Sequence, residues 1–159
     1  MKFQINRLCG VLVAALALGA CAHSAATAPE PASPASASSG PSALYLALGQ
    51  KAGIVALSEQ FVNRLNADPR IAALFKESKL RRVKEKIAEQ LCAVTGGPCV
   101  YTGDSMKEVH GNMGLGMKDF NALVEDLQIT LDEVGVPFSD QNQLLALLAP
   151  MYRDMVKPR

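Results

Sequence analysis

Histidine is scarce in this 159-residue chain, and tryptophan is absent. The two histidines are His23, in a stretch rich in alanine, proline and serine, and His110, in a stretch whose composition favours folding. A folded part with one histidine cannot build a zinc or di-iron site that needs several. It can supply the single axial ligand that a haem iron needs, provided that an apolar pocket surrounds it. We therefore take His110 as the candidate ligand and expect His23 to be solvated.

An excess of charge of one sign is also missing. Only Lys2, Arg7 and Glu30 are charged among the first 41 residues, so residues 42–159 hold fourteen of the sixteen Lys and Arg and fourteen of the fifteen Asp and Glu. This balance predicts no nucleic-acid partner. The same residues contain no defensible Cys–His or Ser–His–Asp pattern and no Gly-rich phosphate loop.

The apolar run at the start of the chain, from Leu8 to Ala20, is too short to span a bilayer and resembles the core of a signal peptide. It ends in Leu18-Gly19-Ala20-Cys21, which resembles a bacterial lipobox. This resemblance implies a signal peptide over 1–20, lipidation of Cys21, and an exported protein anchored to the outer membrane facing the periplasm. The alternative is an ordinary secretory signal with Cys21 incidental. Residues 21–41 lack large apolar side chains and are predicted to be a disordered tether.

Cysteine is limited to four residues, of which Cys9 and Cys21 belong to the first 21 positions. The other two, Cys92 and Cys99, are separated by a Gly/Pro-rich turn at 95–98. In an exported domain this spacing predicts a disulfide. A redox-active pair or two free thiols are the alternatives.

The apolar residues of 42–159 follow helical spacing, and no segment shows a sustained strand pattern. This spacing predicts four main helices over 53–66, 79–94, 117–134 and 140–156, preceded by a short helix over 42–48. Ser139 is the expected N-cap of the last helix. The fold class is therefore a single all-α domain.

Once these helices are laid out, several motifs together resemble the group I truncated haemoglobins, the two-over-two globins. The resemblance spans residues 42–157 and is carried by Leu44-Tyr45, Phe61, Arg64-Leu65, Ala67-Asp68, Phe75, Gly96-Gly97-Pro98, Tyr101-Thr102-Gly103, Met106-Lys107, His110, Phe120 and Gly135-Val136-Pro137. It implies that four main helices sandwich a haem b group, with His110 as the proximal ligand to the iron.

The resemblance also implies a haem pocket. Met106, four residues before His110, would face the same way, and Phe75 would press against the porphyrin. The remaining pocket-lining residues implied are Phe61, Val62, Leu80, Val83, Ile87, Leu91, Leu115, Phe120, Leu123 and Leu127. A plain helical core would use the same residue types.

The sequence departs from the family where bound oxygen is usually stabilised. Val62 stands where many members carry a tyrosine, and Ile87 stands where they carry a glutamine. The distal wall is therefore expected to be apolar, with Gln90 as the nearest polar candidate. Losing such a donor costs about 1.5–3 kcal/mol for an oxygen ligand, whereas carbon monoxide and nitric oxide depend on it much less.

Lys86 sits beside Ile87, where family members often carry a lysine or a histidine. We expect it to pair with a haem propionate. The expected function is the reversible binding of a diatomic gas (oxygen, nitric oxide or carbon monoxide). Detoxification or sensing of nitric oxide are the more specific roles that this binding could serve. A nitric oxide dioxygenase activity would need an external electron donor. The alternatives are a six-coordinate electron-transfer protein with Lys86 as the distal ligand, and a helical lipoprotein that binds no cofactor.

Overall fold

The all-helical architecture is confirmed over residues 41–156, which are the residues that the computed structural model describes. The leader, Cys21, His23 and nearly all of the expected tether lie outside these residues. The elements are α1 (Ala43–Ala47), α2 (Gln50–Ala67), η1 (Ala72–Phe75), α3 (Leu80–Val94), α4 (Met106–His110), α5 (Met117–Glu133), α6 (Phe138–Leu148), η2 (Ala149–Met151) and α7 (Tyr152–Met155). Within 41–156, no helix is both long and apolar enough to cross a bilayer.

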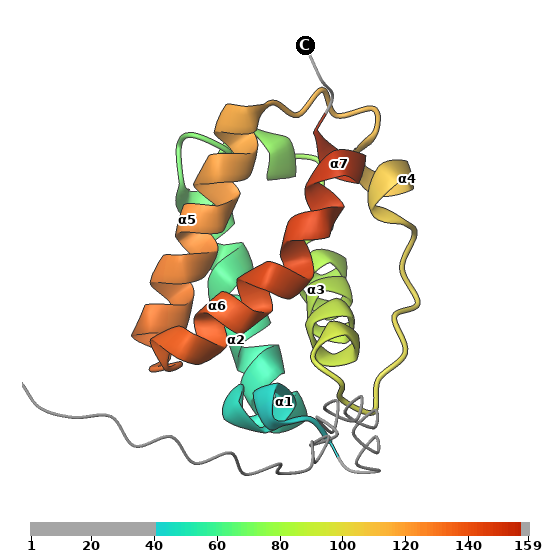
Figure 1. Cartoon of the computed structure of the whole chain (residues 1–159). Coiled ribbons are helices and arrows are strands. Elements are labelled where there is room, and N and C mark those ends of the chain that lie inside the picture. The colour runs from blue at the N-terminus through green and yellow to red at the C-terminus, as the bar shows by residue number, and fades with distance from the viewer. Residues whose placement is uncertain (1–40, 157–159) are drawn as a thin grey trace, which may run out of the picture. The chain divides into compact units, whose positions relative to one another are not determined.

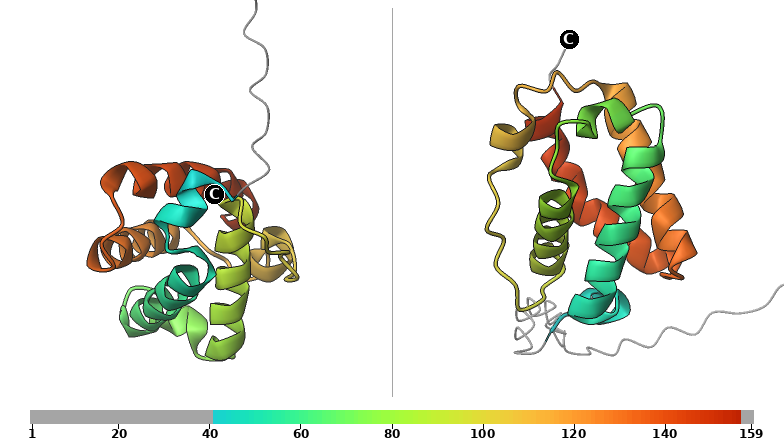
Figure 2. Two further views of the ribbon diagram at one scale, coloured as in Figure 1. Left: turned by 90° about the horizontal axis from the view of Figure 1, so that it is seen from below. Right: turned by 180° about the vertical axis from the view of Figure 1, so that it is seen from behind.

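The helices form two layers. Seen from below in Figure 2, α5, α6 and α7 lie over α2 and α3. The core between them is built on α2, which packs against both α3 and α5 and buries Ile54, Leu57 and Leu65. Leu131 of α5 and Leu144 of α6 are completely buried in the same core. The short helix α4 contacts α7, so His110 is held against the C-terminal end of the domain (Figure 1).

The second helix begins three residues earlier than the apolar spacing predicts, at Gln50. Gly49 makes this start possible because its φ of 76° lies in the left-handed region, which glycine adopts without steric cost. Gly53, a poor helix former, nevertheless lies inside α2. A Cβ atom at this position would collide with the carbonyl oxygen of Leu48, so the glycine allows α1 to pack closely on the start of α2.

The predicted disulfide between Cys92 and Cys99 is present and joins the end of α3 to the loop that leads to α4. Cys92 is buried, and the turn it closes packs against α1. A Cβ atom on Gly97 would strike both the ring of Tyr45 and the Cys92 sulfur. The Gly96-Gly97-Pro98 motif and Tyr45 are thus parts of one contact that fixes where this loop leaves α3.

The expectation for the last helix was wrong in two respects. Pro137, not Ser139, is the N-cap, and the helix starts at Phe138 because the extended backbone of Pro137 (φ −57°, ψ 142°) already turns the chain into it. The predicted single helix is also divided. Pro150 lies in the 3₁₀ segment η2 between α6 and α7, since proline has no N–H to donate to the preceding turn. The break redirects α7 toward α4.

Replacing both Cys92 and Cys99 by serine should lower the free energy of unfolding by about 2.5 kcal/mol, because the closed loop is short and its cross-link restricts the unfolded chain only modestly. Denaturant unfolding of the wild type and the double variant measures this difference. Treating the wild type with a reductant should reproduce the variant's midpoint. A double variant as stable as the oxidised wild type would show that the bridge does not brace the fold.

Candidate haem site

A largely apolar cavity of about 770 Å³ lies between the two helical layers. This volume falls within the range of roughly 300–1,000 Å³ that is usual for cofactor and ligand sites. Every helix from α2 to α7 contributes to its wall. The lining residues are Phe61, Leu65, Phe75, Ser78, Lys79, Arg82, Val83, Lys86, Ile87, Gln90, Leu91, Tyr101, Gly103, Asp104, Met106, Val109, His110, Phe120, Leu123, Val124, Leu127, Leu145, Leu148, Ala149, Met151, Tyr152 and Met155.

His110 stands in the wall of this cavity at the end of α4, half-buried. Its Nδ1 lies 2.9 Å from the carbonyl oxygen of Met106. A carbonyl only accepts hydrogen bonds, so Nδ1 carries the hydrogen and donates it. The lone pair is then on Nε2, which is the arrangement that metal-binding histidines use. The geometry therefore prepares His110 to ligate a metal from one side.

The short helix that carries His110 is fixed by its own sequence. Ser105 and Glu108 form a capping box, in which the Ser105 hydroxyl accepts from the Glu108 N–H and the Glu108 carboxylate accepts from the Ser105 N–H. The Ser105 hydroxyl also donates to the Glu108 carboxylate at 2.6 Å, and this bond, followed by the one from the Ser105 N–H, lowers the pKa of Glu108. Five residues are too few for a stable isolated helix, so this cap and the contact with α7 position the histidine.

The wall formed by α3 across from α4 presents Val83 and Ile87, and Phe61 and Phe75 complete its apolar surface. Val62 is fully buried but does not line the cavity. One residue along a helix turns the side chain by about 100°, so Phe61 faces the cavity while Val62 faces the core. The cavity wall is therefore apolar at Val83 and Ile87, where the sequence predicts an apolar wall.

Gln90 is an uncharged polar residue on the cavity side of α3. Its side-chain nitrogen lies 3.2 Å from the sulfur of Met151 and 3.6 Å from that of Met106. Thioether sulfur is a weak acceptor, so these contacts hold the amide only loosely. Gln90 thereby links α3 to both α4 and the C-terminal segment.

Cationic side chains gather at one part of the cavity wall, namely Lys79, Arg82 and Lys86. Lys86 Nζ donates to both carboxylate oxygens of Glu89 at 2.8 Å and to Thr102 Oγ1 at 2.5 Å. Glu89 also accepts from the Thr102 N–H at 3.0 Å. These bonds, that of Lys86 foremost, lower the pKa of Glu89 to about 2. Lys86 is therefore tied to the loop after α3, away from the centre of the cavity.

Tyr101 closes the cavity from this loop. Its hydroxyl donates to the carbonyl oxygen of Asp104 at 2.8 Å, and burial raises its pKa, so the phenol stays neutral. A Cβ atom on Gly103 would collide with the Tyr101 ring. This contact explains why a glycine follows Tyr101 and Thr102 in the Tyr101-Thr102-Gly103 motif.

Most of the sequence-predicted pocket residues do meet around this cavity. Those that line it are Phe61, Phe75, Val83, Lys86, Ile87, Leu91, Met106, His110, Phe120, Leu123 and Leu127. Val62, Leu80 and Leu115 do not line it. Leu80 is the first residue of α3, and Leu115 is buried in the connection before α5, so both lie at element ends beyond the cavity wall.

The contribution of the C-terminal segment was missed. Leu145, Leu148, Met151, Tyr152 and Met155 line the cavity, and the Tyr152 ring packs edge-on against Phe120 with 4.8 Å between centroids. The helical spacing of Leu148, Met151 and Met155 predicted a buried face there. It could not show that this face borders a cavity rather than the core.

The comparisons with known proteins agree with this geometry. Residues 43–157 match the family of bacterial-like globins. A group 1 truncated hemoglobin from Mycolicibacterium paratuberculosis is 32% identical over 111 residues, which cover 70% of this chain and 82% of the relative. The solved Fe(III) form of the truncated hemoglobin from Tetrahymena pyriformis is 29% identical, with a TM-score of 0.69 over 72% of this chain and 98% of that one. The 2/2 hemoglobin from Synechococcus sp. PCC 7002 superposes with a TM-score of 0.67 at 25% identity, over 71% of this chain and 97% of that one. The predicted two-over-two fold is thereby confirmed.

Substituting Glu89 by glutamine should remove part of the domain's loss of stability in acid. The pKa of Glu89 lies at about 2 in the folded chain against 4.5 for an ordinary glutamate. Its contribution to stability is therefore complete above about pH 4.5 and is lost as the pH falls toward about 2. Urea unfolding between these pH values should show a shallower decline for Glu89→Gln than for the wild type. Glu85→Gln, an exposed acid on the same helix, is the matched control. Identical declines for Glu89→Gln and the wild type would refute this role.

Proposed function

Since the chain belongs to the bacterial-like globin family, we propose that its cavity holds haem b, with His110 as the protein's axial ligand to the iron. The observation that carries this proposal is the His110 ring, whose Nδ1 is committed to the Met106 carbonyl and whose Nε2 is thereby left as the metal-binding atom. Haem would supply an iron that can bind a diatomic gas reversibly.

The residues around His110 fit such a group. An apolar wall suits the porphyrin, and Phe75, Phe120 and Leu127 are placed to pack on it. Lys79 and Arg82 stand at the cavity wall where the two carboxylates of haem would find positive partners. The chain has no C-x-x-C-H sequence, and Cys92 and Cys99 are joined to each other. This favours a haem held by contacts and one ligand rather than by thioether bonds.

The apolar distal wall supports a preference among gases. Val83 and Ile87 carry no hydrogen-bond donor, and the Gln90 amide is directed at two sulfur atoms. An oxygen ligand gains stability from a donor, whereas nitric oxide and carbon monoxide depend on it much less. We therefore propose binding of nitric oxide or carbon monoxide, with short-lived oxygen binding, as the protein's activity. Export and anchoring through Cys21 remain a proposal that rests on the sequence of residues 1–21.

Replacing His110 by alanine should abolish the haem absorption band, because residues 41–156 contain no other histidine. The ultraviolet–visible spectrum of purified protein with equimolar haemin measures this loss. Asn112→Ala, an exposed position two residues further on, should keep the wild-type spectrum. Added imidazole should restore binding to the His110→Ala variant by filling the vacant position. A variant with an unchanged spectrum would show that another group ligates the iron.

Introducing a donor at Ile87 should stabilise oxygen selectively. Ile87→Gln places an amide on the apolar wall, and a hydrogen bond to a charged partner is worth about 1.5–3 kcal/mol. Stopped-flow measurements should show oxygen dissociating about 10- to 100-fold more slowly, with carbon monoxide dissociation nearly unchanged. Ile87→Leu is the control for altered packing. Equal effects on both gases would contradict the assignment of this wall.

Replacing Lys86 by methionine should leave the spin state of the ferric protein unchanged, since Glu89 and Thr102 hold the Lys86 ammonium. Methionine keeps much of the apolar stem but removes the charge. Absorption and electron paramagnetic resonance spectra report the coordination of the iron. A six-coordinate, low-spin wild type that becomes high-spin in Lys86→Met would instead support the electron-transfer alternative.

A further inference from the structure

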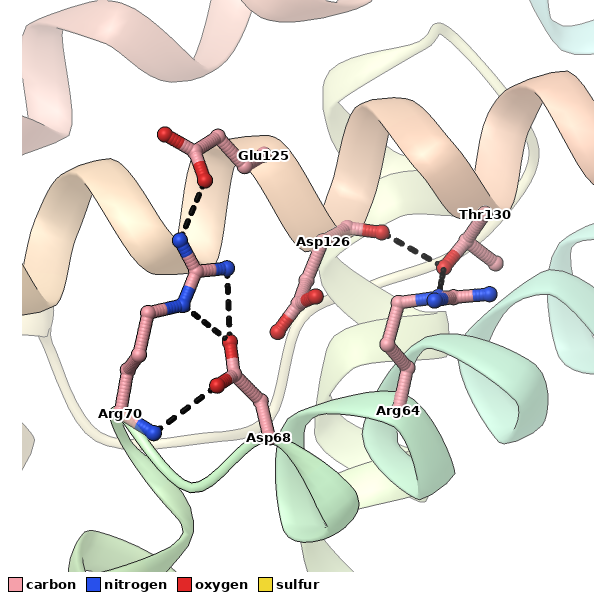
Figure 3. A network of polar contacts seen from close by, with 6 residues as sticks. All are labelled: Arg64, Asp68, Arg70, Glu125, Asp126 and Thr130. Atoms are coloured by element: carbon pink, nitrogen blue, oxygen red, sulfur yellow. Dashed lines mark hydrogen bonds and ion pairs between the residues drawn. The ribbon is translucent and has the colours of Figure 1, made fainter.

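A second, polar cleft lies apart from the haem cavity, between the C-terminal end of α2 and the middle of α5. Arg64, Asp68, Arg70, Asp126 and Glu133 are among the residues that line it. Figure 3 shows most of this network, in which side chains from α2 and the following turn meet side chains from α5. No part of it belongs to the site described above.

The two arginines of the cleft, Arg64 and Arg70, form their ion pairs with acidic residues other than Asp126. The Asp68 carboxylate accepts from the Arg70 N–H and from Arg70 Nε, both at 2.8 Å. Arg70 also pairs with Glu125. Arg64 pairs with Glu133 and donates to Thr130 Oγ1 at 3.3 Å.

Asp126 is the exception in this network. The residue is only 3% exposed, and its Oδ2 has no hydrogen-bond partner among the described residues. Figure 3 shows its carboxyl group turned toward the Asp68 carboxylate. Its backbone carbonyl accepts from Thr130 Oγ1 at 2.7 Å, so the residue is fixed in place on α5.

Two ionised carboxylates in this position would repel each other, and the buried one would lack any donor. Residues 41–156 contain no cluster of three side chains that could ligate a metal ion. We propose that Asp126 keeps its proton and shares it with Asp68, forming a pH-sensitive clamp between α5 and the turn after α2.

The surroundings push the two groups in opposite directions. Burial, and next the neighbouring Asp68 charge, raise the pKa of Asp126 above its ordinary value. The hydrogen bonds from Arg70 lower the pKa of Asp68. Such a split lets one member stay protonated and donate while its partner stays ionised and accepts.

Asp126 and Asp68 contribute to folding stability in opposite directions as the pH changes. The raised pKa of Asp126 gives stability that is full below the unfolded value of 3.8 and is lost as the pH rises through the folded value. The lowered pKa of Asp68 gives stability that is lost as the pH falls below 3.8. The charged groups that face the pair are Arg64 and Arg70 on one side and Glu125 and Glu133 on α5.

The clamp borders the haem cavity through its neighbours. Leu127 follows Asp126 on α5, and Leu65 precedes Asp68 on α2, and both line the cavity. Loss of the shared proton would therefore loosen two walls of the cavity at their junction.

The test uses the full chain labelled with ¹³C-aspartate. Carbon NMR of the side-chain carboxyl groups, assigned by the signal missing in Asp126→Asn, gives the titration of Asp126 directly. We expect its midpoint to lie above that of an ordinary aspartate. A midpoint at or below the ordinary value would overturn the proposal, whether or not the protein binds haem.

Thermal unfolding as a function of pH supplies the second readout. Asparagine at 126 can donate to Asp68 but cannot ionise, so Asp126→Asn should gain a melting temperature about 4 °C or more above the wild type once the pH exceeds the Asp126 midpoint. Glu59→Gln, which changes an exposed acid of α2 outside this network, should keep the wild-type profile. Parallel profiles for the wild type and Asp126→Asn would also overturn the clamp.

Discussion

The cavity between the two helical layers is the feature on which the rest of this domain depends. A closed apolar void costs about 24 cal/mol per Å³, so every 200 Å³ of the cavity that water does not fill would cost about 5 kcal/mol. The whole free energy of unfolding of a small domain is about 5–15 kcal/mol. Such a cost is comparable to the total. A bound group that fills the space is therefore part of the fold's stability, and haem binding and folding should be coupled.

The loop between α3 and α4 carries the chain from the apolar wall of the cavity to the histidine, and three local constraints fix the loop. The Cys92–Cys99 bridge anchors its start, Glu89 holds Thr102 in its middle, and the Ser105 cap sets its end. Because α4 has only five residues, the histidine owes its position to these neighbours rather than to helix propensity.

The helices and the histidine could be predicted from the sequence because each rests on a local signal. Apolar residues at helical spacing locate α2, α3 and α5, and a lone histidine after a Gly/Pro turn marks the candidate ligand. Two glycine motifs were recognised only by resemblance, and their reason became visible in three dimensions: Gly97 makes room for Tyr45, and Gly103 makes room for Tyr101.

What the sequence could not supply were contacts between distant segments. Spacing alone does not say that Tyr152 packs on Phe120, that Gln90 reaches two methionine sulfurs, or that Val62 turns into the core beside Phe61. Pro150 is a helix breaker in any sequence, but the direction that α7 then takes depends on packing. From the sequence alone, Asp126 looks like an ordinary polar residue of α5, and its burial is visible only in the structure.

Ligation of the haem iron by His110 alone is most directly tested by magnetic coupling between the iron and labelled histidine nitrogen. A His23→Ala chain grown with ¹⁵N-histidine contains a single labelled ring, because the sequence has only two histidines. Electron–nuclear double resonance of its ferric haem complex should show ¹⁵N coupling from one axial imidazole. A haem complex without that coupling would mean that His110 is not the ligand, and the site described here would be wrong.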